Sequence, residues 1–369
     1  MKQHRRGASP RVLVFSAGVG AGHDLPARTL EAGIRRRRPD AEVEVVDALA
    51  VMGRLVHYVA EDAMRRTLRR GRWHWLFDAQ YMLFARTPPL RSAGQAALQL
   101  ASGRRLLAEV ERHRPDVVVS VYPVSTEVLA RLRRAGRLRV PVVSAITDLS
   151  SLRYWASRGV DLHLVTHPES IAEVVRIAGP TRVVAARGLC DARFLDPPGP
   201  GDARCVLGLP QDGPVIAISG GGWGVGDVEG ALRVALGVPG ATVLALCGRN
   251  DDLRRRLSSE FPADRVHVLP FVDDMATTLA AADVLVHSTA GLTVLEALLV
   301  GCRPISYGWG IGHIRLNNRA YQRLGLARVA ANHSELRAAI DDALTQPRTP
   351  RARSYAELPD AAELVLEIA

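Results

Sequence analysis

A glycine-rich loop near the start of the chain ends in a histidine: residues 15–30 read FSAGVGAGHDLPARTL, with His23 where a helix is expected to begin. Glycine lets the backbone of such a loop come close to a ligand. A histidine has an unperturbed pKa near ~6.5, so His23 is a candidate general base at neutral pH. The alternative is structural, because this histidine can also cap its helix or bind phosphate. The loop also has the spacing of a dinucleotide site, for which Asp47 would supply the ribose ligand.

A second glycine loop, residues 219–226, follows an apolar run in the second half of the chain. Its exposed amides suit a diphosphate. The stretch HSTAGLTVLEAL at 287–298 predicts another strand-to-helix junction, with Glu296 about one turn into the helix. A carboxylate there can accept both hydroxyls of a ribose, and the alternative is a surface glutamate on a capped helix. Phe271 and Met275 are expected at the end of a further strand, where they either cover a flat base or pack in the core.

The basic residues are concentrated in the first half of the chain. The net charge is +10; residues 1–195 carry 32 Arg or Lys and 18 Asp or Glu, a net +14, and residues 196–369 carry 16 and 20, a net −4. This asymmetry indicates an anionic partner for the first half, either lipid or nucleic acid. A nucleic-acid partner is the least favoured, because the aromatic residues cluster on one stretch and no recognised nucleic-acid module occurs.

That aromatic stretch, residues 51–92, combines large rings with many arginines. Such a composition is typical of a helix that lies in a membrane interface, although a solvated amphipathic helix over the sheet has the same pattern. The residues expected at an anionic membrane surface are Arg65, Arg66, Arg69, Arg70, Trp73 and Trp75.

Short β-branched runs alternate with helical patterns on both sides of a proline- and glycine-rich stretch. Buried strands separated by helices predict parallel sheets, so the expected fold class is α/β, with two doubly wound Rossmann-like domains that face a central cleft. The expected domains are residues 1–195 and 203–369, joined by a linker at 196–202 that sustains no helix. The last helix, within 357–368, is expected to cross back to the first domain. Four scattered cysteines indicate reduced core residues of a cytosolic protein, and no apolar run is long enough for a transmembrane helix.

In this order, the motifs of the second half resemble the nucleotide-sugar half of the family 28 glycosyltransferases, which have the GT-B fold: a glycine loop, CGRN at 247–250, PFVDDM at 270–275 and GLTVLEA at 291–297. The first half agrees independently. SAGVGAGH at 16–23 looks like the start of bacterial diacylglycerol glycosyltransferases and is similar to the loop of plant monogalactosyldiacylglycerol synthases. Because the nucleotide signatures lie after the linker, we interpret the first loop as an acceptor-side loop and Asp47 as structural.

The resemblance implies an inverting, metal-independent transfer of a hexose from a UDP-sugar to a lipid hydroxyl of the diacylglycerol type. His23 would remove the acceptor proton, and Asp148 would orient His23 or be the base itself. The UDP-sugar is a substrate, so no cofactor is expected, and helix-start amides at 221–226 would hold the diphosphate in place of a metal. The residues expected at the donor are Gly221, Gly222, Asn250, Phe271, Met275, Ala290, Gly291, Thr293, Glu296, His313 and Asn317, and the acceptor-side loop contributes Gly20 and Gly22.

The sequence departs from the family after the glutamate motif. The stretch YGWGIGHIRLNN at 307–318 stands where the family has P-G-Q-E-x-x-N, with His313 and Asn317 as the replacements for the glutamine and the asparagine. Sugar, acceptor and oligomeric state therefore stay open. Two alternatives also stay open: a soluble enzyme that glycosylates a small metabolite or epimerises a UDP-sugar, and a non-catalytic nucleotide-sugar-binding protein. The leading hypothesis expects a cytoplasmic enzyme that is peripherally associated with the inner face of the membrane.

Overall fold

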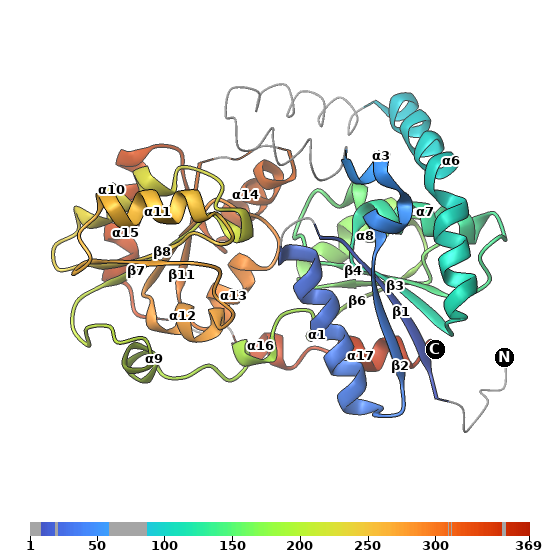
Figure 1. The fold of residues 1–369 in the computed structure, drawn as a ribbon, viewed down its shortest axis with the longest axis horizontal. Coiled ribbons are helices and arrows are strands. Elements are labelled where there is room, and N and C mark those ends of the chain that lie inside the picture. The colour runs from blue at the N-terminus through green and yellow to red at the C-terminus, as the bar shows by residue number, and fades with distance from the viewer. Residues whose placement is uncertain (1–8, 19–20, 59–86, 309, 311, 349–351) are drawn as a thin grey trace.

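The computed structural model describes residues 9–18, 21–58, 87–308, 310, 312–348 and 352–369 of the chain. They form two six-stranded parallel sheets, each covered by helices on both faces (Figure 1). We call the sheet β2-β1-β3-β4-β5-β6 with its helices the first lobe, and the sheet β12-β11-β10-β7-β8-β9 with its helices the second lobe. The α/β fold class with two doubly wound halves is thereby confirmed.

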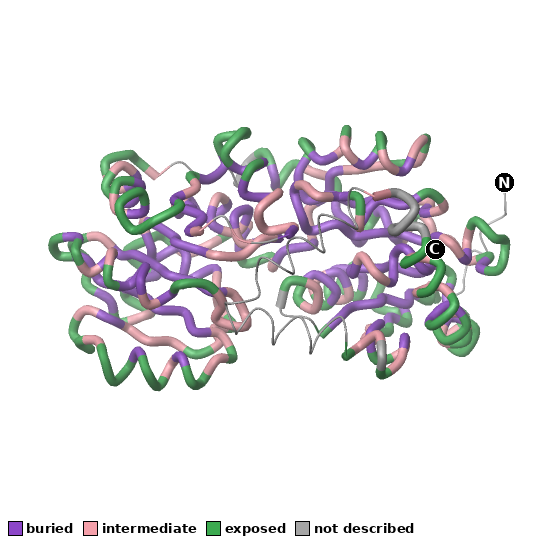
Figure 2. Tube along the Cα trace, turned by 90° about the horizontal axis from the view of Figure 1, so that it is seen from above, coloured by how far each residue is buried: buried purple, intermediate pink, exposed green. Residues whose placement is uncertain are grey.

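Most of the strands form where the sequence has short apolar, β-branched runs, because a parallel strand that is covered on both faces must be apolar along its whole length. Figure 2 shows buried segments that run through the interior of each lobe. The first-lobe strands are β1 Arg11–Ser16, β2 Glu42–Asp47, β3 Val117–Ser120, β4 Val142–Ile146, β5 Leu162–Val165 and β6 Arg182–Ala185. The second-lobe strands are β7 Val215–Ser219, β8 Thr242–Leu246, β9 Val266–Leu269, β10 Val284–His287, β11 Arg303–Tyr307 and β12 Arg328–Ala330.

Two layers of helices cover the sheet of the first lobe. Helices α1 and α17 pack on one face, through Leu30 and Ile34 of the former and Leu364 and Val365 of the latter. Helices α6, α7 and α2 pack on the other face. The helices are α1 Ala21–Arg37, α2 Ala48–Met52, α3 Arg54–His57, α6 Pro88–His113, α7 Pro123–Arg134, α8 Ile171–Ala178 and α17 Ala361–Leu366, with short 3-10 turns η2 Leu152–Tyr154, η3 Pro168–Ser170 and η4 Ala192–Phe194.

The second lobe repeats this arrangement. Helices α10, α11 and α15 pack on one face of its sheet. Helices α9, α12, α13 and α16 pack on the other face. The elements are α9 Pro200–Val206, η5 Gly221–Trp223, α10 Val228–Leu236, α11 Asp251–Glu260, α12 Met275–Ala281, α13 Thr293–Leu299, α14 His313–Leu324, α15 His333–Thr345 and α16 Ala352–Ala356.

The chain passes between the lobes twice. The first passage includes residues 196–202, and here the expectation of a stretch without helix is wrong in part: Pro200 begins α9, because a proline fits the first helical position, where its missing N–H is not needed. The second passage is the tail, whose last helix lies beside α1 in the first lobe (Figure 1). Asp360, at the start of that helix, forms ion pairs with Arg37 and Arg187. Across the residues described, no helix combines the length and the apolar character that crossing a membrane requires.

Candidate active site

A cleft of about 730 Å³ lies between the lobes, where the carboxyl ends of both sheets face each other. Ligands of doubly wound proteins bind at this end of the strands. The cleft brings together most of the residues that the sequence predicts: Gly22, His23 and Asp148 from the first lobe, and Gly221, Gly222, Phe271, Met275, Ala290, Gly291, Thr293, Glu296 and His313 from the second.

The His23 ring is oriented by a backbone carbonyl. Its Nδ1 lies 2.9 Å from the carbonyl oxygen of Val121, in the loop after β3. A carbonyl oxygen can only accept a hydrogen bond, so Nδ1 carries the proton and Nε2 has the lone pair. Burial lowers the pKa of His23 to about 4, although the charge of Asp148 opposes this shift. The imidazole is therefore neutral at pH 7, which is the form that can accept a proton.

Two aromatic rings flank His23. Tyr122 meets it edge-on at a centroid distance of 5.0 Å, and Trp155 is tilted against it at 5.6 Å. The indole Nε1 of Trp155 donates a hydrogen bond of 3.0 Å to Oδ2 of the buried Asp148. The orienting partner of His23 is thus the Val121 carbonyl, and Asp148 acts on the ring through its charge. Which of the two residues is the base stays a prediction.

Glu296 lies one turn into α13, on the second-lobe side of the cleft. Burial raises the pKa of its carboxyl to about 7, and the nearby charge of Asp191 adds to the shift. Within the part of the chain that the structure describes, no donor forms a hydrogen bond to this carboxylate. A half-buried carboxyl that has a raised pKa and no hydrogen-bond donor can gain such donors from a ligand. Hydroxyl groups of the ligand would donate to the carboxylate and stabilise its anionic form.

The glycine loop at 219–226 is tightly packed against the neighbouring strand ends. Gly221 has a φ of +68°, and a Cβ atom there would lie 2.7 Å from Cγ2 of Thr289. The sequence interpretation of 221–226 as helix-start amides is wrong in one respect, because α10 begins only at Val228 and its first turn is capped by Asp227. The loop therefore offers amides of a 3-10 turn, η5, rather than the N-terminus of a long helix.

Two predicted donor residues do not line the cleft. Oδ1 of Asn250 caps α11 by accepting from Leu253, and its Nδ2 donates to the Trp223 carbonyl. Asn317 is fully buried in α14, where its amide bonds backbone groups of both lobes. A donor contact does not fit either residue, because in each case the side-chain amide is already engaged by the backbone.

Some predicted residues lie outside the described part of the chain. Gly20 and the six membrane candidates Arg65, Arg66, Arg69, Arg70, Trp73 and Trp75 belong to this group. Other cleft residues were missed by sequence reasoning, among them Leu25, Leu98, Tyr122, Val124, Cys190, Arg193 and Trp223. The position of Tyr122 at the carboxyl end of a predicted strand is the one signal that could have placed it at the cleft.

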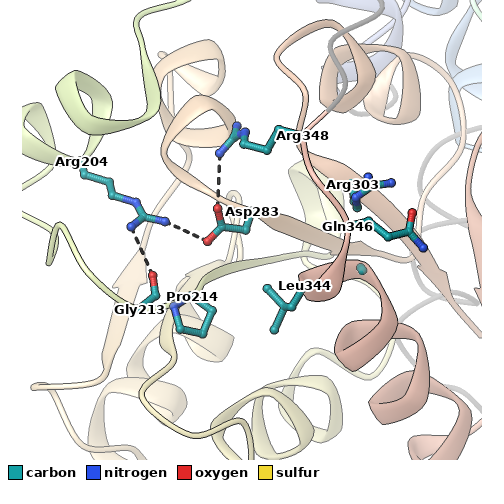
Figure 3. Close-up of a pocket in the computed structure, with 9 residues that line it drawn as sticks. Arg204, Gly213, Pro214, Asp283, Arg303, Leu344, Gln346 and Arg348 are labelled. Carbon is teal, nitrogen blue, oxygen red and sulfur yellow. Dashed lines mark hydrogen bonds and ion pairs between the residues drawn. The ribbon is translucent and has the colours of Figure 1, made fainter.

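A second cavity, of about 450 Å³, opens among the amino ends of the second-lobe strands (Figure 3). Arg204 donates to the Gly213 carbonyl and to Asp283, and Arg348 forms a longer ion pair with the same carboxylate. These guanidinium groups hold the edge of the sheet together. Among the described residues, no cluster of three or more His, Cys, Asp or Glu side chains is arranged to hold a metal ion.

The comparisons with known proteins point to glycosyltransferases. The family model for monogalactosyldiacylglycerol (MGDG) synthase matches residues 23–189. The processive diacylglycerol beta-glucosyltransferase of Bacillus cereus is 22% identical over 333 residues, which cover 89% of this chain and 84% of the relative. The enzyme of that name from Bacillus mycoides gives the same identity and coverage.

Solved structures share the fold. The spinosyn rhamnosyltransferase SpnG superposes with a TM-score of 0.63 at 15% identity, covering 97% of this chain and 99% of that one. MurG of Acinetobacter baumannii superposes with a TM-score of 0.56 at 16% identity, with the same coverage. The chain therefore has the GT-B fold and is a glycosyltransferase that is similar to the monogalactosyldiacylglycerol synthases and the processive diacylglycerol glucosyltransferases.

Proposed function

We propose that the enzyme transfers a hexose from a UDP-sugar to the hydroxyl of a diacylglycerol-type lipid, with inversion at the anomeric carbon and without a metal ion. The observation that carries the proposal is that one cleft holds both His23, with its Nε2 lone pair, and the carboxyl of Glu296. The names of the relatives support the lipid acceptor.

The acceptor hydroxyl would be activated by His23. As the acceptor oxygen attacks the anomeric carbon, its proton passes to Nε2, and the bond from that carbon to the diphosphate oxygen breaks. The imidazolium that forms is stabilised by the negative charge of Asp148, whose position is fixed by the Trp155 indole. The proton then leaves to solvent, and UDP departs as the anion.

The donor would be held by the second lobe. The amides around Gly221 and Gly222 would receive the diphosphate, and Glu296 would accept the two ribose hydroxyls. Phe271 suits the uracil ring, because it lines the cleft and one face of its ring is covered by the Arg249 guanidinium at 4.4 Å from the ring centroid. His313 lies on the same wall of the cleft, and we assign it to the hexose.

The lipid would enter from the first lobe. Leu25, Leu98 and Val124 line that side of the cleft, and 47% of Leu25 is exposed. Apolar side chains at a cleft mouth suit an acyl chain. The net +14 charge of residues 1–195 would hold the enzyme at anionic lipid on the inner face of the membrane.

The test is to incubate the purified protein with labelled UDP-glucose, UDP-galactose or UDP-N-acetylglucosamine and with vesicles of diacylglycerol and anionic phospholipid. We expect labelled glycolipid, and sedimentation of the protein with anionic but not with neutral vesicles. If label appears only in water-soluble products, the enzyme uses a small acceptor. If no donor is consumed and none binds, the transferase proposal fails.

A further inference from the structure

The loop that follows β4 carries Asp148 and then enters the other lobe. The side chain of Leu149 is 3% exposed and packs in a small apolar cluster with Val294, Ala320 and Tyr321 of the second lobe. Leu149 thus follows a strand of the first lobe in the chain, but its side chain packs in the second lobe. Tyr321 in turn donates to the carbonyl of Gly291, in the glycine turn of the donor wall.

Asn317 of α14 holds the backbone of the same loop. Its Oδ1 accepts hydrogen bonds from the amides of Leu149, at 3.0 Å, and Ser150, at 3.1 Å. Its Nδ2 donates to the carbonyls of Ser150, at 3.3 Å, and His313, at 2.9 Å. All four hydrogen-bonding positions of this buried amide are therefore used, three of them on the other lobe.

Residues of the first lobe also hold this loop. Ser170 donates a hydrogen bond of 2.8 Å to the Leu149 carbonyl, and Glu173 accepts from the amide of Leu152. Because Asn317 and these first-lobe residues all bond to it, the backbone next to Asp148 has little freedom. Asn317, which does not line the cleft, thus holds the backbone of the two residues that follow Asp148.

We propose that Asn317 is a positioning residue, which sets the position of Asp148 by clasping residues 149–150 and so couples the contact between the lobes to the assembly of the site. The expected effect of Asn317 on kcat rests on the proposed function. The contact between the lobes is a property of the fold alone and can be measured without turnover.

The kinetic test compares Asn317→Ala with Asn318→Ala. Asn318 is the neighbouring buried asparagine, and its amide donates to Gly308 in its own lobe. We expect Asn317→Ala to lower kcat by about 10- to 100-fold, the scale of a small misplacement of a reacting group, with the Kd for UDP changed by less than about twofold. Asn318→Ala is expected to keep the wild-type kcat. Equal losses in both variants would overturn the proposal.

A double-mutant cycle with Asp148→Asn separates positioning from general destabilisation. If Asn317 acts through Asp148, the kcat loss from Asn317→Ala shrinks to about twofold or less once Asp148 is already replaced. Multiplicative losses would mean that the two residues act independently, which overturns the proposed role. Leu149→Ala, which weakens the same clasp from the other lobe, replaces Asn317→Ala in the cycle if that variant does not fold.

Small-angle X-ray scattering tests the contact between the lobes without substrate, through the radius of gyration of the protein. Asn317→Ala and Leu149→Ala are expected to have a larger radius of gyration than the wild type, and Asn318→Ala is expected to match it. If the wild type transfers no sugar but the clasp variants expand, the proposed function fails while the clasp stands. If the clasp variants keep the wild-type radius and the wild-type kcat, the clasp fails while the function stands.

Discussion

The raised pKa of Glu296 makes the binding of UDP dependent on pH. The carboxyl has a pKa of about 7 in the free protein. If it accepts two ribose hydroxyls, the anion is favoured in the complex and the pKa falls on binding. Since the bound state holds fewer protons, affinity must rise as the pH rises through 7. Replacing Glu296 with glutamine keeps the shape of the side chain and removes this titration.

The size of the effect follows from the protonated fraction of the carboxyl. With a pKa of about 7, roughly nine in ten Glu296 carboxyls are protonated at pH 6 and roughly one in ten at pH 8. If the pKa returns toward its ordinary value in the complex, UDP binds about tenfold more tightly at pH 8 than at pH 6, which is about 1.4 kcal/mol. Binding at pH 6 then releases close to one proton.

Isothermal titration calorimetry measures both quantities. UDP is titrated into the wild type and into Glu296→Gln at pH 6 and pH 8, in two buffers with different ionisation enthalpies. The variant serves as the control, because any pH dependence that it keeps comes from the UDP phosphate and from other groups. If the wild type and the variant show the same pH dependence and the same proton release, Glu296 does not meet the ribose, and the assignment of the donor wall is refuted.

Three further predictions concern the first lobe and the glycine loop. His23→Ala should lower kcat by about 10²- to 10⁴-fold with UDP affinity unchanged, measured by steady-state transfer and calorimetry; a residual rate near that of the wild type would rule His23 out as the base. Trp155→Phe removes the N–H that donates to Asp148 and should cost roughly tenfold in kcat, the effect of one hydrogen bond to a charged group; an unchanged kcat would show that the indole donor is dispensable. Gly221→Ala should bind UDP at least about tenfold more weakly, because its positive φ disfavours alanine and the new Cβ would press on Thr289; a wild-type Kd would show that the loop has room to adjust.

The sequence predicted the sheets well because their chemistry is local. A parallel strand that is covered on both faces needs an unbroken apolar run, and stretches such as DVVVSVY and PVIAISG supply one. The edge strand β12 was missed, because its three residues, Arg328–Ala330, form no such run. The start of helix α9 was missed because the surrounding prolines and glycines indicated a linker without helix. A proline is nevertheless tolerated at the first position of a helix, and Pro200 occupies that position in α9.

The sequence predicted the cleft residues that lie near strand ends better than it predicted the orientation of side chains on helices. Glycine loops and residues near the ends of strands, such as Phe271, had to gather at one edge, because the carboxyl ends of parallel strands share that edge. The sequence does not reveal which way a helical side chain is turned. Asn317 stands in the right motif but faces Leu149, a partner 168 positions away, and no local pattern encodes such a contact.

The return of the tail to the first lobe has a consequence for the order of folding. Part of the apolar interior beneath α1 is supplied by Ala361, Leu364 and Val365, which follow the whole second lobe in the chain. During translation the first lobe therefore keeps an uncovered apolar groove until the second lobe has been synthesised and α17 can pack against α1.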